Sequence, residues 1–303
     1  MINAILRGKP DAGNPHVRFD EGEVASVKPR RGSLLYKKLI VMCGLLAAMA
    51  AGAAVETEIE KDIAYAAPER CKLDVKWPKG MTNFATVVWF HGGGLTGGGK
   101  HFIRIDESIA QVAVNYRLLG KDGLTDGAEC IRDAAAAVAW TLENIAKYGG
   151  DPKKVYVSGM SAGGYLTMMV GMAPQYIKER GHDIGELAGL APVSGQATKH
   201  FNVRKFGGDA DPQYLPKIDV LAPLAYCSKD IPPIISICGE EPWEWPCRSE
   251  ENRLLISSCV ALGHDKAWFV SCPFADHGRA FTAGVPYVEM FVKGRIPPAL
   301  KVK

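Results

Sequence analysis

From about residue 70 onward, the apolar residues follow two patterns that alternate along the chain. Short apolar runs, typical of buried strands, are separated by longer segments in which apolar residues recur at helical spacing. This alternation predicts an α/β fold with a mainly parallel central sheet and helices on both faces. The expected strands cover residues 71–75, 86–91, 110–116, 155–158, 189–193, 233–238 and 267–271.

The helical pattern occurs in four segments. Residues 129–148 carry apolar residues three and four positions apart, and this segment stops at Gly149-Gly150, as helices often do at glycine. Methionines in the segment after Ser161 are interpreted as core residues rather than as part of a cofactor site. The other helices are expected directly after Ser161 and at residues 250–262 and 281–291.

The first 54 residues show neither pattern. Residues 1–36 carry several Lys and Arg side chains without apolar periodicity and are interpreted as an extension outside the folded domain. Within residues 37–54, Lys37-Lys38 precede an apolar stretch and then small residues, the order typical of a secretory signal peptide. Because no repeat or low-complexity linker interrupts the remainder, residues 55–303 are predicted to form one domain.

A secretory signal implies a secreted or periplasmic protein. The alternative is a membrane anchor, but this stretch is rich in Ala and shorter than the roughly 20 strongly apolar residues that span a bilayer. We therefore expect no stable membrane partner unless the signal stays uncleaved. Export makes disulfides feasible for the seven cysteines after the signal, and their spacing predicts neither a pairing nor a metal site.

The composition excludes two classes of protein. A hydrophobic content of 47% is ample for a continuous core, so the chain is not disordered throughout. The net charge of +3 is small and arises largely near the N-terminus, which gives no case for a nucleic-acid partner.

Two glycine-rich segments carry the candidate chemistry, and each follows an expected strand. The second segment, Gly159-Met160-Ser161-Ala162-Gly163, follows residues 155–158 and precedes an expected helix. Small residues on both sides let strand and helix approach closely while Ser161 occupies the exposed turn between them. This context predicts that Ser161 is a nucleophile.

The first segment, His91-Gly92-Gly93-Gly94, follows the strand expected at residues 86–91. Glycines there can turn backbone N–H groups toward a substrate carbonyl oxygen. We expect Gly92 and Gly93 to donate to the oxyanion together with the N–H of Ala162. His91 is interpreted as a residue that braces this loop.

A serine nucleophile also needs a base and an acid that orients it. His277 follows the last expected strand, where the chain order serine, acid, histidine would place the base. The acid belongs in the loop after residues 233–238, where Glu240, Glu241 and Glu244 compete. Asp276 adjoins His277 and is ranked below the three glutamates because its carboxylate could not readily reach the ring.

The chain resembles the α/β-hydrolase superfamily over residues 70–295, and within it the hormone-sensitive-lipase-like and bacterial feruloyl-esterase-like branch. The resemblance implies Ser161 as nucleophile, His277 as base and Gly92, Gly93 and Ala162 as oxyanion donors. It depends on six motifs in this order: Trp89-Phe-His-Gly-Gly-Gly94, Asn115-Tyr-Arg-Leu118, Asp133 with Ala134 to Trp140, Tyr148-Gly-Gly-Asp-Pro152, Gly159-Met-Ser-Ala-Gly-Gly164 and Asp276-His-Gly278.

The acid loop departs from the family pattern. Pro242 stands where relatives commonly carry an acid, three residues after the loop glycine. An Asp-Pro pair of the lipase-like branch aligns with Glu241-Pro242, and Glu244 matches a second acidic position found in close relatives. On this comparison Glu241 is preferred over Glu244.

The resemblance implies a carboxylic-ester hydrolase that acts through an acyl-enzyme without a metal or other cofactor. The expected partner is a small-molecule or carbohydrate-linked ester, and export favours acetyl or feruloyl esters of polysaccharides. Two alternatives stay open. The first is an amidase, formamidase or peptidase of the same fold. The second is a noncatalytic binding protein that lost its acid, an idea prompted by Pro242. The oligomeric state is not predicted.

Overall fold

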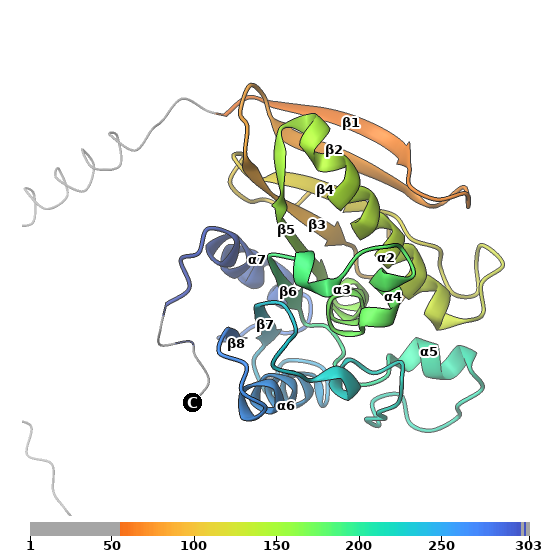
Figure 1. Ribbon diagram of the computed structural model, residues 1–303. Helices are drawn as coiled ribbons and strands as arrows, with labels where there is room; N and C mark the ends of the chain where they lie inside the picture. The colour runs from red at the N-terminus through yellow and green to blue at the C-terminus, as the bar shows by residue number, and fades with distance from the viewer. Residues whose placement is uncertain (1–54, 298–299, 301–303) are drawn as a thin grey trace, which may run out of the picture. The chain divides into compact units, whose positions relative to one another are not determined.

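The centre of the molecule is a mixed β-sheet (Figure 1). The computed structural model describes residues 55–297 and residue 300, and within them eight strands are arranged in the order β1-β2-β4-β3-β5-β6-β7-β8. The strands β3 to β8 run parallel to one another, whereas β2 pairs antiparallel with both β1 and β4. Their bounds are β1 (Thr57–Ala64), β2 (Lys72–Pro78), β3 (Phe84–Phe90), β4 (Ala110–Val114), β5 (Gly150–Met160), β6 (Gly189–Val193), β7 (Ile234–Gly239) and β8 (Ala267–Cys272).

The parallel strands form because their sequences are apolar on both faces. Every residue of β4, β6 and β7 is buried, which is the state expected of strands that are covered on both sides. Their parallel pairing requires long crossover connections, and each of these contains a helix except residues 91–109 between β3 and β4.

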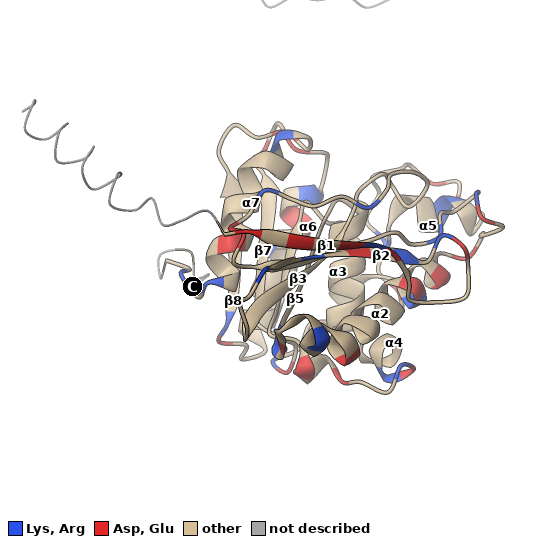
Figure 2. Cartoon of the chain, turned by 90° about the horizontal axis from the view of Figure 1, so that it is seen from above, with Lys and Arg blue, Asp and Glu red and all other residues tan. Residues whose placement is uncertain are grey.

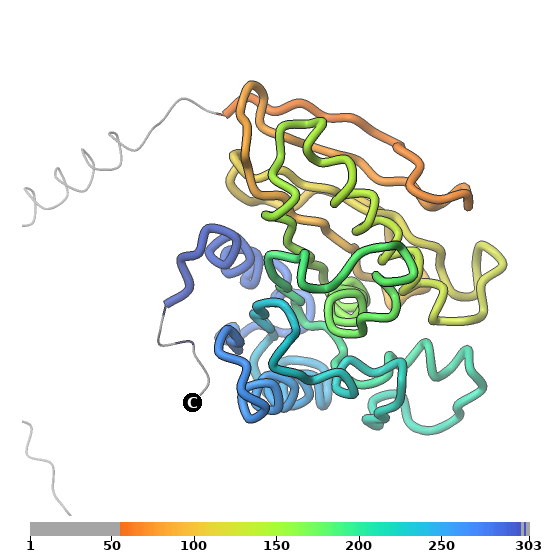
Figure 3. The backbone as a smooth tube through the Cα atoms, viewed as in Figure 1, coloured from red at the N-terminus to blue at the C-terminus, as the bar shows by residue number. Residues whose placement is uncertain are grey.

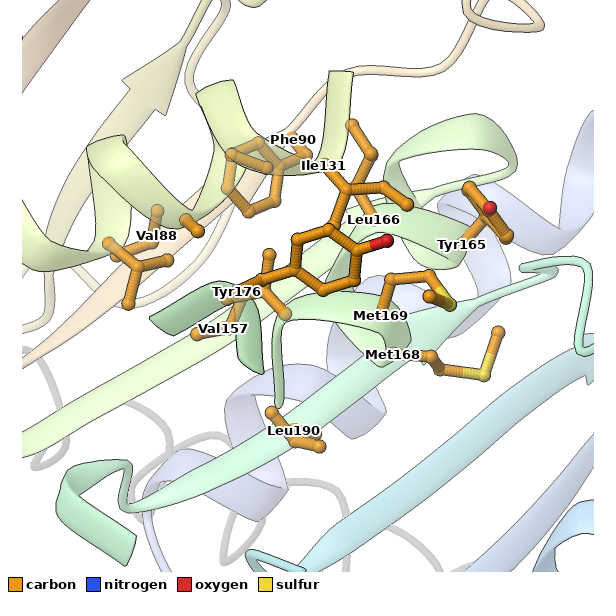
Figure 4. Close-up of a cluster of buried hydrophobic side chains, with 14 of the residues drawn as sticks. Val88, Phe90, Ile131, Val157, Tyr165, Leu166, Met168, Met169, Tyr176 and Leu190 are labelled. Carbon is orange, nitrogen blue, oxygen red and sulfur yellow. The ribbon is translucent and has the colours of Figure 1, made fainter. Parts of the chain in front are cut away.

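Helices cover both faces of the sheet (Figures 1 and 3). Apolar residues of α2, α3 and α6 join one large core with β3 and β5, and α7 packs in two smaller clusters on the opposite face. Figure 4 shows part of the large core, where Phe90, Ile131 and Leu166 lie together. The helices are α2 (Gly127–Asn144), α3 (Ala162–Met172), α4 (Pro174–Lys178), α5 (Phe201–Phe206), α6 (Arg248–Ala261) and α7 (Arg279–Val292), with short 3₁₀ turns at Ile145–Tyr148, Ile184–Glu186 and Pro223–Tyr226.

The fold predicted from the sequence is confirmed. Each of the seven expected strands and four expected helices is present, with bounds shifted by a few residues. The buried side chains of Met168 and Met169 confirm that these methionines belong to the core (Figure 4). The prediction missed β1 and the short helices α4 and α5.

Strand β1 was not predicted because most of its residues are exposed, so its sequence lacks the apolar pattern of a buried strand. Six of its eight residues are exposed, and Asp and Glu residues lie along it (Figure 2). It is an edge strand held by its ladder with β2, so it carries no apolar alternation to detect. The predicted extension at residues 1–36 and signal peptide at residues 37–54 lie outside the described residues. Of the helices in the described part, none is long and apolar enough to cross a membrane.

Candidate active site

The candidate residues meet at one edge of the sheet. His91 follows β3, Ser161 follows β5, Glu244 lies in the loop after β7, and His277 lies in the loop after β8. Because these strands are parallel, their carboxyl ends share an edge, and the loops that leave them lie side by side. The topology thus gathers residues that are more than a hundred positions apart in the sequence.

Ser161 occupies a strained turn between β5 and α3. Its φ of 57° and ψ of −113° are rare for a residue with a side chain, and its N–H donates to the carbonyl of Val193 at 2.8 Å. The expected close approach of the flanking glycines is confirmed: a Cβ on Gly163 would lie 2.0 Å from the carbonyl oxygen of Phe90, and one on Gly159 would lie 2.6 Å from Gly163. The turn therefore requires glycine on both sides of the serine.

Three side chains form a continuous hydrogen-bonded series. The Ser161 hydroxyl lies 2.9 Å from Nε2 of His277, and Nδ1 of His277 lies 2.7 Å from Oε1 of Glu244. The carboxylate accepts a hydrogen bond from the Nδ1–H group, so Nε2 carries no proton and can accept the proton of the serine hydroxyl. This is the arrangement that makes a hydroxyl nucleophilic.

Glu244 is held by four donors. Its Oε1 accepts from His277 and from the N–H of Trp245 at 2.8 Å, and its Oε2 accepts from the Ser194 hydroxyl at 2.7 Å and the N–H of Gly239 at 3.0 Å. Burial alone would raise the pKa of Glu244. The hydrogen bond and charge of His277 lower it, the hydrogen bonds from Ser194 and the Trp245 N–H lower it further, and the pKa of Glu244 lies below its usual value. The carboxylate is therefore ionised at neutral pH.

The geometry reverses the preference for Glu241. Glu241 is exposed, and within the described residues its carboxylate makes no hydrogen bond to His277. A single turn of the loop explains the difference, because the carbonyl of Glu240 accepts from the N–H groups of both Trp243 and Glu244. That turn brings Glu244 back beneath Gly239, where its carboxylate reaches the His277 ring.

Trp245 supports the base from its face. Its ring stacks on that of His277, with centroids 3.7 Å apart and planes inclined by 13°. Phe201 and Tyr214 lie 6.2 and 6.0 Å from the Trp245 ring and extend this aromatic wall. The guanidinium of Arg248 lies 5.7 Å from the same ring, is buried, and donates to the carbonyl of Ser194 at 2.7 Å.

Sequence reasoning missed Ser194 and Arg248. Ser194 directly follows β6, so the rule that placed Ser161 and His277 at strand ends would also have placed Ser194 at this edge. Arg248 begins α6, and no local pattern shows that it would reach the carbonyl of a residue 54 positions away.

The glycine segment after β3 lies against Ser161. A Cβ on Gly92 would be 3.5 Å from the Cβ of Ser161, and Gly93 has a φ of 101° that favours glycine. Within the described part of the chain, the amides of Gly92 and Gly93 have no protein acceptor. Ala162 opens α3, so its N–H is one of those a helix start leaves without an intrahelical partner.

His91 braces this segment. Its Nδ1 donates to the Gly92 carbonyl at 2.6 Å, its ring stacks on Tyr116 at 4.4 Å, and the Tyr116 hydroxyl donates to the His91 carbonyl at 2.9 Å. Burial lowers the pKa of His91 to about 4, so the ring is neutral at physiological pH. The expected bracing role is confirmed by these contacts.

Among the residues with described positions, no group of three or more His, Cys, Asp or Glu side chains could hold a metal ion.

The sequence is similar to proteins of known families over part of its length. The BD-FAE family model matches residues 73–189. Carboxylesterase 1F of Mus musculus is 36% identical over 124 residues, which are 37% of this chain and 22% of that protein. The liver carboxylesterase of Sus scrofa is 34% identical over 116 residues, which are 34% of this chain and 20% of that protein. The chain thus spans about a fifth of the length of these curated relatives.

Solved structures match over most of the chain. A truncated carbohydrate esterase from gut microbiota has a TM-score of 0.64 at 18% identity, covering 80% of this chain and 98% of that one. Esterase B from Lactobacillus rhamnosis has a TM-score of 0.60 at 19% identity, covering 86% and 96%. At this identity the likeness shows the fold. The chain thus has the α/β-hydrolase fold of these esterase structures, and its sequence is similar to the BD-FAE family over residues 73–189 and to carboxylesterases over about a third of its length.

Proposed function

We propose that this chain is a serine hydrolase that cleaves carboxylic esters through an acyl-enzyme. The observation that carries the proposal is the pair of contacts at His277, 2.9 Å to Ser161 and 2.7 Å to Glu244. In this proposal Ser161 is the nucleophile, His277 the general base and then acid, and Glu244 the carboxylate that orients it. Glu241 has no part in the reaction.

The first half of the reaction forms the acyl-enzyme. The Ser161 hydroxyl attacks the ester carbonyl while its proton passes to Nε2 of His277. The carbonyl oxygen gains negative charge and accepts hydrogen bonds from the amides of Gly92, Gly93 and Ala162. Collapse of this intermediate breaks the ester C–O bond, and the alcohol leaves with the proton that His277 returns.

The second half regenerates the serine. Water attacks the acyl carbonyl, gives its proton to His277, and the acid leaves as Ser161 recovers that proton. Each oxyanion donor of this kind contributes about 3 kcal/mol to the transition state. The ionised Glu244 favours the imidazolium that forms twice in the cycle, because the two opposite charges are separated by a single hydrogen bond.

The finer part of the proposal concerns substrate and location. We propose that the alcohol component belongs to a polysaccharide acylated with acetyl or feruloyl groups and that the protein is exported. The support is the resemblance to feruloyl-esterase-like proteins, the BD-FAE match at residues 73–189, and the signal-peptide pattern of residues 37–54. Release of acetate or ferulate from acylated xylan tests the substrate, and N-terminal sequencing of protein from the periplasm or medium tests export.

Turnover of p-nitrophenyl acetate tests the reaction. We expect hydrolysis by the wild-type chain and its loss in Ser161→Ala; equal turnover by the two would refute the nucleophile assignment. Parallel assays with p-nitroacetanilide and N-formyl substrates separate an esterase from an amidase or formamidase. The noncatalytic alternative assumes that the acid was lost, because Pro242 stands at a position that is commonly acidic. Glu244 lies beside His277 and supplies such a carboxylate, which favours the catalytic proposal.

A further inference from the structure

Two large aromatic side chains are exposed next to the candidate active site. Trp243 is 58% exposed and immediately precedes Glu244, and Phe274 is 76% exposed and lies three residues before His277. Neither ring has an aromatic partner among the described residues, whereas the neighbouring Trp245 is stacked on the His277 ring. Single exposed apolar residues are ordinary, but two aromatic rings beside the reacting groups form a candidate contact surface.

Glu240 links the backbones that carry these rings. Its carboxylate accepts from the N–H of Phe274 at 2.7 Å, its carbonyl accepts from the N–H of Trp243 at 2.8 Å, and its own N–H donates to the carbonyl of Ala275 at 2.9 Å. The loops after β7 and β8 are thereby tied together at one residue. The backbones that carry the two rings are thereby held close to Glu244 and His277, which lie on the same two loops.

Phe274 contributes little to the stability of the fold. Its φ of 56° is in the left-handed region, which bulky residues avoid and which Asn and Gly adopt readily. A side chain that is three-quarters exposed buries little apolar surface in return. Backbone preference and burial both favour another residue here, so the aromatic ring is explained by a contact outside the chain.

The charges around the two rings favour a neutral ligand rich in hydroxyl groups. Glu240, Glu241 and Asp276 lie within three residues of Trp243 or Phe274. Among the described residues, Asp276 is paired with Arg279 at 3.9 Å, and neither Glu240 nor Glu241 forms a salt bridge. Carboxylates accept hydrogen bonds from hydroxyl groups and repel anionic ligands, including anionic lipid headgroups. A sugar ring combines an apolar C–H face, which packs on an aromatic ring, with hydroxyl groups at its rim.

We propose that Trp243 and Phe274 form an aromatic platform that stacks on the sugar rings of an esterified oligosaccharide or polysaccharide. The platform lies beside the reacting groups and holds the saccharide whose ester is presented to Ser161. This inference rests on the proposed esterase function and identifies the residues that select its alcohol component.

The experiment compares two substrates across four variants. Trp243→Ala, Phe274→Ala and Phe274→Asn alter the platform, and Leu262→Ala alters a 54%-exposed apolar residue at the far end of α6. For each variant, kcat/KM is measured on acetylated xylo-oligosaccharides and on p-nitrophenyl acetate, which carries no sugar. Phe274→Asn provides the check on folding, since Asn suits the backbone and should keep or raise Tm.

We expect each platform variant to lower the ratio of the two kcat/KM values about two- to tenfold, the range that one aromatic contact contributes. Leu262→Ala should leave the ratio at the wild-type value. An unchanged ratio in all three platform variants would overturn the proposal. So would a loss confined to emulsified triacylglycerols or vesicles, which would assign the rings to a lipid surface.

A second measurement does not depend on catalysis. Isothermal titration of Ser161→Ala with deacetylated xylo-oligosaccharides should show binding that Trp243→Ala weakens. If the wild type hydrolyses no ester but this binding is present, the proposed function fails and the platform stands. If p-nitrophenyl acetate is hydrolysed and the saccharide does not bind, the platform fails alone.

Discussion

Replacement of Glu244 by Gln tests whether Glu244 or Glu241 is the acid that orients His277, and its effect follows from the hydrogen bonds around the Glu244 carboxylate. All four groups around the carboxylate are donors: His277 Nδ1, Trp245 N, Ser194 Oγ and Gly239 N. An amide keeps the shape of the carboxylate but introduces an NH₂ group, which cannot accept. Either orientation of the amide therefore sets two donors against it.

The less costly orientation places the NH₂ at the Oε2 position. The Ser194 hydroxyl can rotate and accept, but the Gly239 N–H is fixed and loses its partner, at a cost of about 1–3 kcal/mol in the free energy of unfolding. The amide oxygen then still accepts from His277, but the negative charge that favours the imidazolium is gone. We expect kcat to fall about 10²- to 10⁴-fold, or about 3–5 kcal/mol in the barrier.

The assay is hydrolysis of p-nitrophenyl acetate by Glu244→Gln and Glu241→Gln, with denaturant unfolding of both to exclude misfolding. Glu241 is exposed and makes no hydrogen bond to the His277 ring among the described residues, so its variant should keep kcat/KM within about twofold of the wild type. A large loss in Glu241→Gln, or wild-type activity in Glu244→Gln, would refute the reasoning.

Three further predictions address the surroundings of the reacting groups. Gly163→Ala places a Cβ 2.0 Å from the Phe90 carbonyl oxygen and should lower the free energy of unfolding by about 3 kcal/mol or more; a loss under about 1 kcal/mol in urea unfolding would contradict the close approach. Trp245→Ala removes the ring stacked on His277 and should lower kcat/KM about three- to tenfold, with most of it restored in Trp245→Phe; equal values for the two variants would show that stacking is unimportant. Because burial depresses the pKa of His91 from 6.5 to about 4, the unfolded chain takes up this proton first, so the contribution is complete above pH 6.5 and is lost as the pH falls toward 4. From this group the free energy of unfolding should be about 2 kcal/mol lower at pH 4.5 than at pH 7, and this part of the loss should be missing in His91→Asn.

The sequence predicted the parts of the fold that burial determines. Strands such as β4 and β6 are apolar at every position, and helix α2 has its apolar residues at helical spacing and a glycine stop, so each was visible as a local pattern. Strand β1 was missed because ladder hydrogen bonds to β2 hold it, and these leave no trace in its own sequence. Local pattern thus finds elements that are buried and misses those held only by a neighbour.

The same distinction applies to the candidate site. Ser161 and His277 were found because each stands at the end of a recognisable strand. The choice between Glu241 and Glu244 depends on one backbone turn at Glu240 and on donors from Ser194 and Gly239, which only the folded loops bring together. The family resemblance ranks the two glutamates by their positions in the sequence. The hydrogen bond to the His277 imidazole, which Glu244 makes, decides between them.

The central claim is that Ser161 is an activated nucleophile, and covalent labelling tests it most directly. The folded wild-type chain is treated with a fluorophosphonate, digested and analysed by mass spectrometry, with His277→Ala as the control. We expect one adduct on the peptide that contains Ser161, formed far more slowly in His277→Ala because no base then takes the hydroxyl proton. An unlabelled Ser161 in the folded wild-type protein would contradict it.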